Sequence, residues 1–319
     1  MKEDNELLDE VVVVGYGVQK KRDVTTAIAS IRASDLKGQP VTSMAEAMVG
    51  KMPGVQVSQS TGAPGSSLQI KVRGTGTITA GTSPLYVVDG VPLAQEQLNT
   101  FNMNDVESIE VLKDASSAAI YGSRGSNGVV LITTKHGKAG KINISAKVET
   151  SYNTRTITPE FVDGYTHARM MNEARITRNQ EPIYQNDELE ILRLGLDPDL
   201  YPNVDWKDVL LKDGAMTYRA NVNMNGGGNT ARYFVSLSYI SEEGMYKTDE
   251  AVRKDYNTNP GSQRWNYRLN TDIDITKTTL VKVGVSGSLK KRNAPGQGGN
   301  VWASLINQSP ISIPVMYSN

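Results

Sequence analysis

The chain has 319 residues, and its 34 Lys and Arg are balanced by 34 Asp and Glu, so the formal net charge is zero. A nucleic-acid binder that works through bulk positive charge is therefore excluded. Cysteine is absent, which excludes disulfides, thiol catalysis and cysteine-ligated metals. The longest aliphatic runs cover only residues 11–14 and 129–132, far short of the roughly 18 apolar residues of a membrane helix.

The first ten residues are polar and acidic, and an abrupt block of four valines follows at residues 11–14. β-Branched residues favour an extended conformation, so this block is either a strand that awaits a partner or a buried strand of the next domain. The charged start is not followed by an apolar core, so it is not a signal sequence. We expect that either the protein is cytosolic or its true N-terminus is missing.

Residues 24–137 are typical of a compact mixed α/β domain. Candidate helices cover 42–49, with Ser43 as a possible N-cap, and 115–120, with Asp114 in that role. Turn signals such as Asp89-Gly90 separate the elements. The candidate strands are 24–31, 55–59, 68–72, 85–88, 109–112 and 129–134.

From residue 142 onward, apolar and polar residues alternate strictly in five segments. These segments lie near 142–149, 218–225, 233–239, 264–275 and 281–290. Alternation of this length indicates antiparallel strands longer than the five or six residues usual in soluble proteins. Strands of about ten residues with one apolar face are typical of a transmembrane β-barrel, and a soluble β-sandwich with a solvated polar face is the alternative.

The connections between these strands alternate between short and long. Residues 226–230 and 276–278 have the composition of tight turns, whereas 154–217, 241–263 and the residues from 291 onward are long and polar. Outer-membrane barrels have short periplasmic turns and long external loops. The pattern therefore predicts that 154–217 is an external loop, ordered by helices at 167–175 and 187–194.

Few residues suggest catalytic or metal chemistry. His136 and His167 are too few for a histidine-rich metal site or a catalytic triad, and we expect both at the surface. Asp197, Asp199 and Asp205 offer the oxygen ligands that Ca²⁺ prefers, but their spacing is not that of a calcium loop, and solvation and capping are favoured instead. The sequence predicts no cofactor and a protein that is not an enzyme.

Several motifs resemble those of the SusC/RagA-like TonB-dependent transporters of the Bacteroidetes outer membrane. The matching strings are DEVVVVGYG from residue 9, SQSTGAPG from 58, IKVRG from 70, PLYVVDGVP from 84, IEVLKDASSAAIYGSRGSNGVVLITTK from 109, DPDLYPNVDW from 197 and RYFVSLSY from 232. The resemblance implies an α+β plug domain followed by the first antiparallel strands of a transmembrane β-barrel, which has 22 strands when complete.

The resemblance also implies a division of the chain and a location in the outer membrane. Residues 1–23 would be a linker with a TonB-box-like segment, 24–137 the plug domain, and 138–319 a partial barrel of about five strands. At the strand spacing seen here, 22 strands need roughly 780 residues. We therefore expect the sequence to be a fragment that lacks roughly 600 residues at its C-terminus and is clipped at its N-terminus.

The function implied is active import of oligosaccharides, or in some branches peptides, with a SusD-like surface lipoprotein as partner. Siderophore or cobalamin import is a nearby alternative, and a soluble β-rich binding or adhesion protein is an alternative from another class. Import would be driven by TonB, which binds an extended segment by strand addition. We assign TonB binding to Glu10, Val11, Val12, Val13, Val14, Gly15 and Tyr16.

Polar contacts would hold the plug inside the barrel. The plug residues expected to make them are Arg73, Asp89, Glu110, Lys113, Asp114 and Arg124. Arg264, Arg268, Asp272 and Asp274 would supply the wall, because they share the polar face of one strand. For any one of these residues, an ordinary solvated ion pair or an ion pair within the plug is an equally good interpretation. On the external side, Tyr184, Tyr201, Trp206 and Trp302 could stack on sugars, but packing of the loops is favoured.

Overall fold

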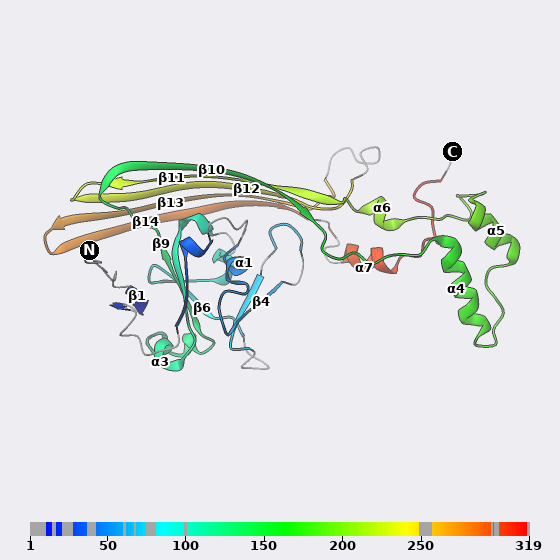
Figure 1. Cartoon of the computed structure of the whole chain (residues 1–319), viewed down its shortest axis with the longest axis horizontal. Coiled ribbons are helices and arrows are strands. Elements are labelled where there is room, and N and C mark those ends of the chain that lie inside the picture. The colour runs from blue at the N-terminus through cyan, green and yellow to red at the C-terminus, as the bar shows by residue number, and fades with distance from the viewer. Residues whose placement is uncertain are drawn as a thin grey trace, which may run out of the picture. The chain divides into compact units, whose positions relative to one another are not determined.

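The structure is a computed structural model that describes residues 11–14, 17–20, 28–36, 43–59, 62–66, 68–74, 81–98, 101–248, 257–294, 296 and 300–317. The chain forms two compact units. The first consists of Met1–Ser151, Tyr218–Ser241 and Gln263–Lys291, and the second consists of Tyr152–Thr217, Glu242–Ser262 and Arg292–Asn319. The first unit contains a mixed α/β domain, which we call the plug, and a sheet of five long strands (Figure 1).

The plug is built on a five-stranded sheet with the order β3-β8-β9-β6-β7. Its strands are β3 (Ile28–Arg32), β6 (Leu85–Val88), β7 (Val91–Leu93), β8 (Val106–Leu112) and β9 (Val129–Thr134). β6 and β9 run parallel and the other neighbours are antiparallel. β8 and β9 lie at the centre and are rich in buried Val, Ile and Leu, as expected for strands that are covered on both faces.

Short helices and one hairpin complete the plug around this sheet. The main apolar core joins Ile109 and Val106 of β8 to Met48 of helix α1 (Met44–Met48). The Ser43 side chain caps α1 by accepting a hydrogen bond from the Glu46 amide, as predicted. The remaining elements are hairpin β4 (Val55–Gln59) and β5 (Leu68–Val72), helices α2 (Gln95–Leu98) and α3 (Ala115–Ala118), and 3₁₀ turns η2 (Ala33–Leu36), η3 (Met103–Asp105) and η4 (Ala119–Gly125).

Most predicted plug strands are confirmed. Those at 55–59, 68–72, 85–88 and 129–134 have the predicted bounds, β8 begins three residues earlier than predicted, and β3 covers the described end of the strand expected at 24–31. β7 was not predicted. The valine block forms β1 (Val11–Val14), which pairs with β2 (Gly17–Lys20) in a separate two-stranded sheet.

The five alternating segments form one sheet in chain order, as predicted. Its strands have 13 to 16 residues each and are β10 (Gly140–Thr154), β11 (Gly214–Gly227), β12 (Ala231–Glu243), β13 (Gly261–Thr276) and β14 (Thr279–Asn293). Tight turns join β11 to β12 and β13 to β14, whereas long segments follow β10, β12 and β14. We call this sheet the wall.

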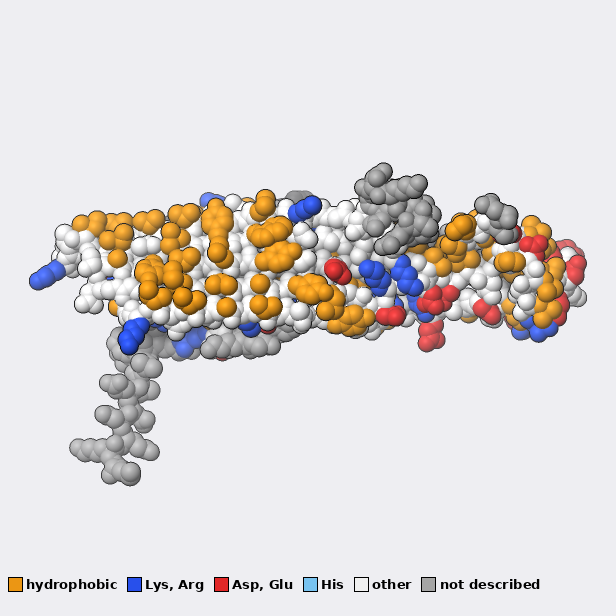
Figure 2. Space-filling model, turned by 90° about the horizontal axis from the view of Figure 1, so that it is seen from above, with side chains coloured by type: hydrophobic (Ala, Val, Ile, Leu, Met, Phe, Trp, Pro, Cys, Tyr) orange, Lys and Arg blue, Asp and Glu red, His pale blue; other side chains and the backbone are white. Residues whose placement is uncertain are grey.

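The two faces of the wall have the reverse of the polarity found in soluble proteins. In β13 the side chains of Asn266 and Arg268 are buried, while those of Trp265, Tyr267 and Leu269 are 41%, 51% and 38% exposed. Figure 2 shows apolar side chains gathered in rows over the outward face, where charged side chains are sparse. An exposed apolar face combined with a buried polar face is the arrangement of strands that face lipid.

The second unit is built from segments that follow β10, β12 and β14. It contains α4 (Gly164–Ile176), α5 (Asn186–Leu194), α6 (Trp206–Leu210) and α7 (Asn300–Asn307). The residues after α7 are bound to the α6 region, since the Val204 amide donates to the Pro310 carbonyl at 2.9 Å and the Trp206 indole donates to the Ser309 carbonyl at 3.0 Å. The helices predicted at 167–175 and 187–194 are confirmed by α4 and α5. Within the described ranges, each helix is too short or too polar to cross a membrane.

Candidate functional site at the plug–wall interface

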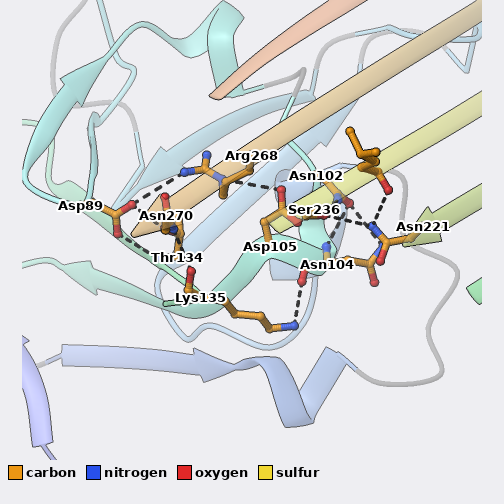
Figure 3. A network of polar contacts seen from close by, with 11 residues as sticks. Asp89, Asn102, Asn104, Asp105, Thr134, Lys135, Asn221, Ser236, Arg268 and Asn270 are labelled. Atoms are coloured by element: carbon orange, nitrogen blue, oxygen red, sulfur yellow. Dashed lines mark hydrogen bonds and ion pairs between the residues drawn. The ribbon is translucent and has the colours of Figure 1, made fainter. Parts of the chain in front are cut away.

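The plug and the wall meet through a network of polar contacts (Figure 3). On the plug side, the network uses the β6–β7 turn, η3 with the residue before it, and the end of β9. On the wall side, it uses the inward face of β11, β12 and β13. The residues are Asp89, Asn102, Asn104, Asp105, Thr134 and Lys135 of the plug and Asn221, Ser236, Arg268 and Asn270 of the wall.

Arg268 of β13 is the charged centre of this network. Its side chain is 8% exposed, and its Nε atom lies 3.6 Å from Oδ2 of Asp105. Its Nη1 atom lies 3.9 Å from Oδ2 of Asp89, and the guanidinium carbon lies 4.6 Å from the centre of the Phe101 ring. A buried cation needs such partners because removing it from water is costly. Two carboxylates and one aromatic ring of the plug therefore compensate the buried positive charge of one arginine of the wall.

Asp105 is the most deeply buried carboxylate of the network. Burial raises the pKa of Asp105, and its interactions with Ser236, Arg268, Lys135 and Asn102 oppose that rise. The Asn102 amide donates to Oδ1 of Asp105 at 3.0 Å and lies 3.5 Å from the Ser236 hydroxyl of β12. Polar groups from two wall strands and from the plug thus surround one buried carboxylate.

Asp89 reaches the wall because of the turn in which it lies. β6 and β7 are joined by Asp89-Gly90, and the φ angles of these residues are 48° and 86°. Positive φ at both positions is the hallmark of a type I′ hairpin turn, which favours Asp-Gly. In this conformation the Asp89 carboxylate accepts hydrogen bonds from the Thr134 amide at 2.8 Å and the Thr134 hydroxyl at 2.6 Å. The turn signal in the sequence is confirmed.

Asn270 links β13 to the end of β9. Its side-chain amide donates to the Thr134 hydroxyl at 2.8 Å and to the Lys135 carbonyl at 2.7 Å. The Lys135 ammonium in turn donates to the Asn104 carbonyl at 2.7 Å. Hydrogen bonds therefore run continuously from the wall through β9 to η3.

Three further contacts join the plug side to the wall. His136 Nδ1 lies 3.1 Å from Oδ1 of Asp272, the Lys138 amide donates to Asn225, and the Lys290 ammonium donates to the Gly65 carbonyl at 2.7 Å. The sequence analysis expected both histidines at the surface, and the structure shows both partly exposed. Each is half-buried, because His136 faces β13 and His167 packs beside the Ser309 hydroxyl within the second unit.

The structure places the six predicted plug residues in different environments. Asp89 contacts Arg268, whereas Arg73 and Asp114 form an ion pair within the plug. Lys113 donates to the Pro53 carbonyl, also within the plug. Glu110 is buried in β8 between β3 and β9, and Arg124 is exposed in η4.

On the wall, Arg268 and Asp272 contact the plug, while Asp274 pairs with Arg232 of β12 at 2.8 Å. Arg264 lies on the inward face of β13. The sequence prediction did not include Asn102, Asp105, Thr134, Lys135 or Asn270 as plug–wall contacts. The only available signal was Asn270 itself, which shares the polar face of the alternating segment with Arg268.

Of the predicted TonB-binding segment, Val11, Val12, Val13 and Val14 form β1, whereas Glu10, Gly15 and Tyr16 lie outside the described residues. The aromatic residues predicted on the external side belong to the second unit. Tyr184, Tyr201, Trp206 and Trp302 are half-buried there, and the Tyr201 hydroxyl donates to Glu188 at 3.2 Å.

The aspartates considered as calcium ligands make local contacts. Asp197 accepts from the Leu200 amide at 3.0 Å, and Asp205 caps α6 by accepting from the Lys207 and Asp208 amides. In the part of the chain that the structure describes, no three His, Asp or Glu residues are grouped closely enough to hold a metal ion.

Comparison with known proteins shows which family has this architecture. Residues 20–129 match the model of the TonB-dependent Receptor Plug Domain. The chain is 38% identical to TonB-dependent receptor P26 of Formosa agariphila over 96% of the chain and 29% of that receptor. It is 36% identical to TonB-dependent receptor SusC of Bacteroides thetaiotaomicron over 79% of the chain and 24% of SusC. The chain thus spans less than a third of either relative.

A solved structure shows the same arrangement of plug and strands. The structure of the RagAB peptide importer in its open-open state superposes with a TM-score of 0.74 and 27% sequence identity, over 90% of this chain and 33% of that one. The matched relatives are receptors and importers rather than enzymes. Together with the plug domain and the inverted polarity of the wall, these matches place the chain among the SusC/RagA-like TonB-dependent receptors of the outer membrane.

Proposed function

We propose that the protein imports a solute across the outer membrane, with the plug as the gate. The observation that carries this proposal is the plug–wall network, in which Arg268 and Asn270 bind the plug from a wall whose other face is apolar. A polar wall is suited to a hydrated path once the plug yields. The hydrogen bonds with the plug close that path and are individually weak enough to be broken by an applied force.

We propose that this force comes from TonB, because an outer membrane has no supply of ATP. TonB would bind the segment from Glu10 to Tyr16, whose described part is the strand Val11–Val14. Strand addition uses main-chain hydrogen bonds, and proline lacks the amide donor. Val12→Pro should therefore abolish uptake while ligand binding to intact cells is retained. Unchanged uptake by this variant would contradict the assignment.

We propose an oligosaccharide as the solute and a SusD-like surface lipoprotein as the partner, both implied by the family resemblance. A peptide is the second candidate, and the superposition with the RagAB peptide importer favours it. Cells that lack the protein, with and without its gene restored, should be given labelled oligosaccharides and labelled peptides in separate uptake assays. Restored uptake of only one class assigns the solute, and restoration of neither contradicts import of these two classes.

The direction of the strands is a separate part of the proposal. We place the long segments that follow β10, β12 and β14 outside the cell and the β13–β14 turn in the periplasm, since long loops of outer-membrane barrels are external. The chain has no cysteine, so single cysteines can be labelled cleanly. With a membrane-impermeant maleimide on intact cells, Gln180→Cys after α4 should react and Lys277→Cys in the turn should not. The reverse labelling would overturn the orientation.

A further inference from the structure

The residues from Lys135 to Lys138, which we call the connector, lie across the inward face of the wall between β9 and β10. The Lys135 carbonyl accepts a hydrogen bond from Asn270 at 2.7 Å, and His136 Nδ1 lies 3.1 Å from Oδ1 of Asp272. Both partners belong to β13. The connector therefore begins on this strand of the wall.

The second half of the connector crosses β12 and reaches β11. Gly137 packs directly on the backbone of β12, where a Cβ atom would overlap the amide of Tyr233. The Lys138 amide then donates to Oδ1 of Asn225 in β11 at 2.9 Å. From Gly140 the chain continues as β10, the neighbour of β11 in the sheet. Consecutive residues of the connector thus contact β13, β12 and β11 in the order of the sheet.

The contacts that the wall receives consequently fall into two groups. One group belongs to the connector. The other belongs to the body of the plug, where Asn102 lies 3.5 Å from the Ser236 hydroxyl and Asp105 lies beside Arg268. The connector adjoins the wall strand β10 in the sequence, whereas β8 and β9 separate Asp105 from the connector. The two groups therefore differ in how closely the chain itself holds them to the wall.

We propose that the connector stays bound to the wall while the plug moves, so that only the second group of contacts opens during import. This inference rests on the proposed function. It adds a fixed end to the gate, because the plug is displaced ahead of Thr134 and stays tethered at Lys135. The hydrated path then opens along Ser236 and Arg268 rather than beneath the connector at Asp272.

The physical reason is the length of chain that must close each contact. The entropic cost of closing a loop rises with its length. A connector contact that breaks is kept near its partner by β10, so the effective concentration of the two groups stays high and the contact re-forms. The pair of Arg268 and Asp105 has no such restraint once the plug has moved. A force applied ahead of the plug also reaches the connector last, since β9 is the final strand of the plug.

Hydrogen exchange tests whether the two groups open independently, and it needs no solute. In the detergent-solubilised full-length protein, Arg268→Met should accelerate exchange in η3 and β9. The Lys138 amide should still exchange within about twofold of its wild-type rate, because its bond to Asn225 is retained. Acceleration of the Lys138 amide to the same extent as β9 would overturn the proposal, since the connector and the plug would then open as one unit.

Gly137→Ala is the converse test, because the added Cβ atom would lift the connector from β12. Exchange of the Lys138 amide should then accelerate by about tenfold or more. The matched control is Gly228→Ala in the β11–β12 turn, where an added Cβ atom meets nothing within 4 Å. This control should leave the exchange of Lys138 unchanged. If Gly137→Ala also leaves it unchanged, the connector is not held on the wall as proposed and the inference is refuted.

Crosslinks separate this inference from the proposed function. His136→Cys/Asp272→Cys joins the connector to β13, and Asn102→Cys/Ser236→Cys joins the body of the plug to β12. This sequence has no other cysteine. Each pair is bridged in cells by a short bis-methanethiosulfonate reagent, and the yield is measured by mass. Uptake of the labelled class that the protein restores, oligosaccharide or peptide, is then compared for each variant before and after reduction with dithiothreitol.

The crosslinked connector should give uptake within about twofold of the same variant after reduction, whereas the crosslinked plug should lose about tenfold or more. A tenfold reversible loss with the connector crosslink would overturn the inference and leave import by displacement of the plug intact. If neither crosslink lowers uptake, the plug does not leave the wall, which refutes both the inference and the gate. If the wild type restores uptake of neither class, the proposed import of these classes fails, and the exchange rates of Lys138 decide the inference.

Discussion

The Nε atom of Arg268 lies 3.6 Å from the Asp105 carboxylate, and both side chains are more than nine-tenths buried. This pair joins the wall to the plug between residues far apart in the sequence. A buried ion pair contributes little net stability compared with a well-packed apolar contact, but removal of one partner leaves an uncompensated charge. The pair therefore fixes where the plug docks and penalises any docking position that separates the two charges.

Arg268→Met should weaken the attachment of the plug to the wall. It leaves the carboxylate of Asp105 buried without its cation, which costs about 3–5 kcal/mol. Hydrogen exchange of η3 and β9 in the detergent-solubilised protein should accelerate accordingly. Adding Asp105→Asn to this variant should recover part of the loss. The matched control is Arg232→Met, because Arg232 and Asp274 form a more exposed pair within the wall, for which we expect at most about 1 kcal/mol.

Substitutions of Asp89 should separate the contribution of its turn conformation to stability from the contribution of its hydrogen bonds. Asp89→Gly retains positive φ but loses both acceptors for Thr134, whereas Asp89→Ala loses the acceptors and is also strained at φ 48°. The alanine variant should be less stable than the glycine variant by about 1–2 kcal/mol. Asp89→Asn tolerates positive φ and retains one acceptor, so it should be the most stable of the three. Urea titration of the plug checks the order, and equal stability of the alanine and glycine variants would contradict it.

The apolar face of the wall predicts opposite effects for neighbouring positions. Val222 is 47% exposed on the outward face of β11, and Asn223 lies on the inward face. Val222→Arg places a charge against lipid, which costs about 2–4 kcal/mol near the middle of the bilayer. Asn223→Arg retains a polar group on the polar face. The first variant should reduce the folded protein in outer membranes and the second should not, as measured by heat-modifiable mobility on gels. Equal yields would argue against the assigned lipid-facing side.

The burial of Asp105 predicts a particular dependence on pH. Because burial raises its pKa above the ordinary value of about 3.9, this residue stabilises the folded state below that value. The contribution is lost as the pH rises through the raised pKa. The wild type should therefore gain thermal stability relative to Asp105→Asn as the pH is lowered from neutral to about 4. Relative loss of stability over that range would mean that attraction to Arg268 outweighs burial.

Local sequence signals predicted most of the strands but not all of the plug. β6 and β9 are short runs of mainly β-branched or aliphatic residues, β4 and β5 alternate apolar and polar residues, and turn residues bound all four, so their limits were evident. β7 escaped prediction because Pro92 lies inside it, and proline is accepted only at sheet edges or irregularities. β8 begins with Val106-Glu107-Ser108, whose polar residues resemble a loop. These errors arise where tertiary pairing overrides a local preference.

The candidate site was predictable only in part. Alternation in β13 identified Arg268 as an inward-facing residue, and the Asp89-Gly90 signal identified the turn. The pairing of Arg268 with Asp105 was not predictable, since Asp105 lies in a polar stretch that resembles any solvated loop. Contacts between residues so distant in sequence depend on how the plug docks against the wall. The sequence periodicity within either segment does not predict how the plug docks.

The composition of the plug–wall network has a consequence for the import that we propose. Apart from the Phe101 ring, the contacts at Arg268, Asn270 and Asp89 are made by groups that water satisfies equally well. When the plug withdraws, each hydrogen bond is exchanged for one with solvent at little net cost. In the import that we propose, water would therefore solvate the polar face of the wall when the plug leaves, and the same surface would bind the plug again in the next cycle.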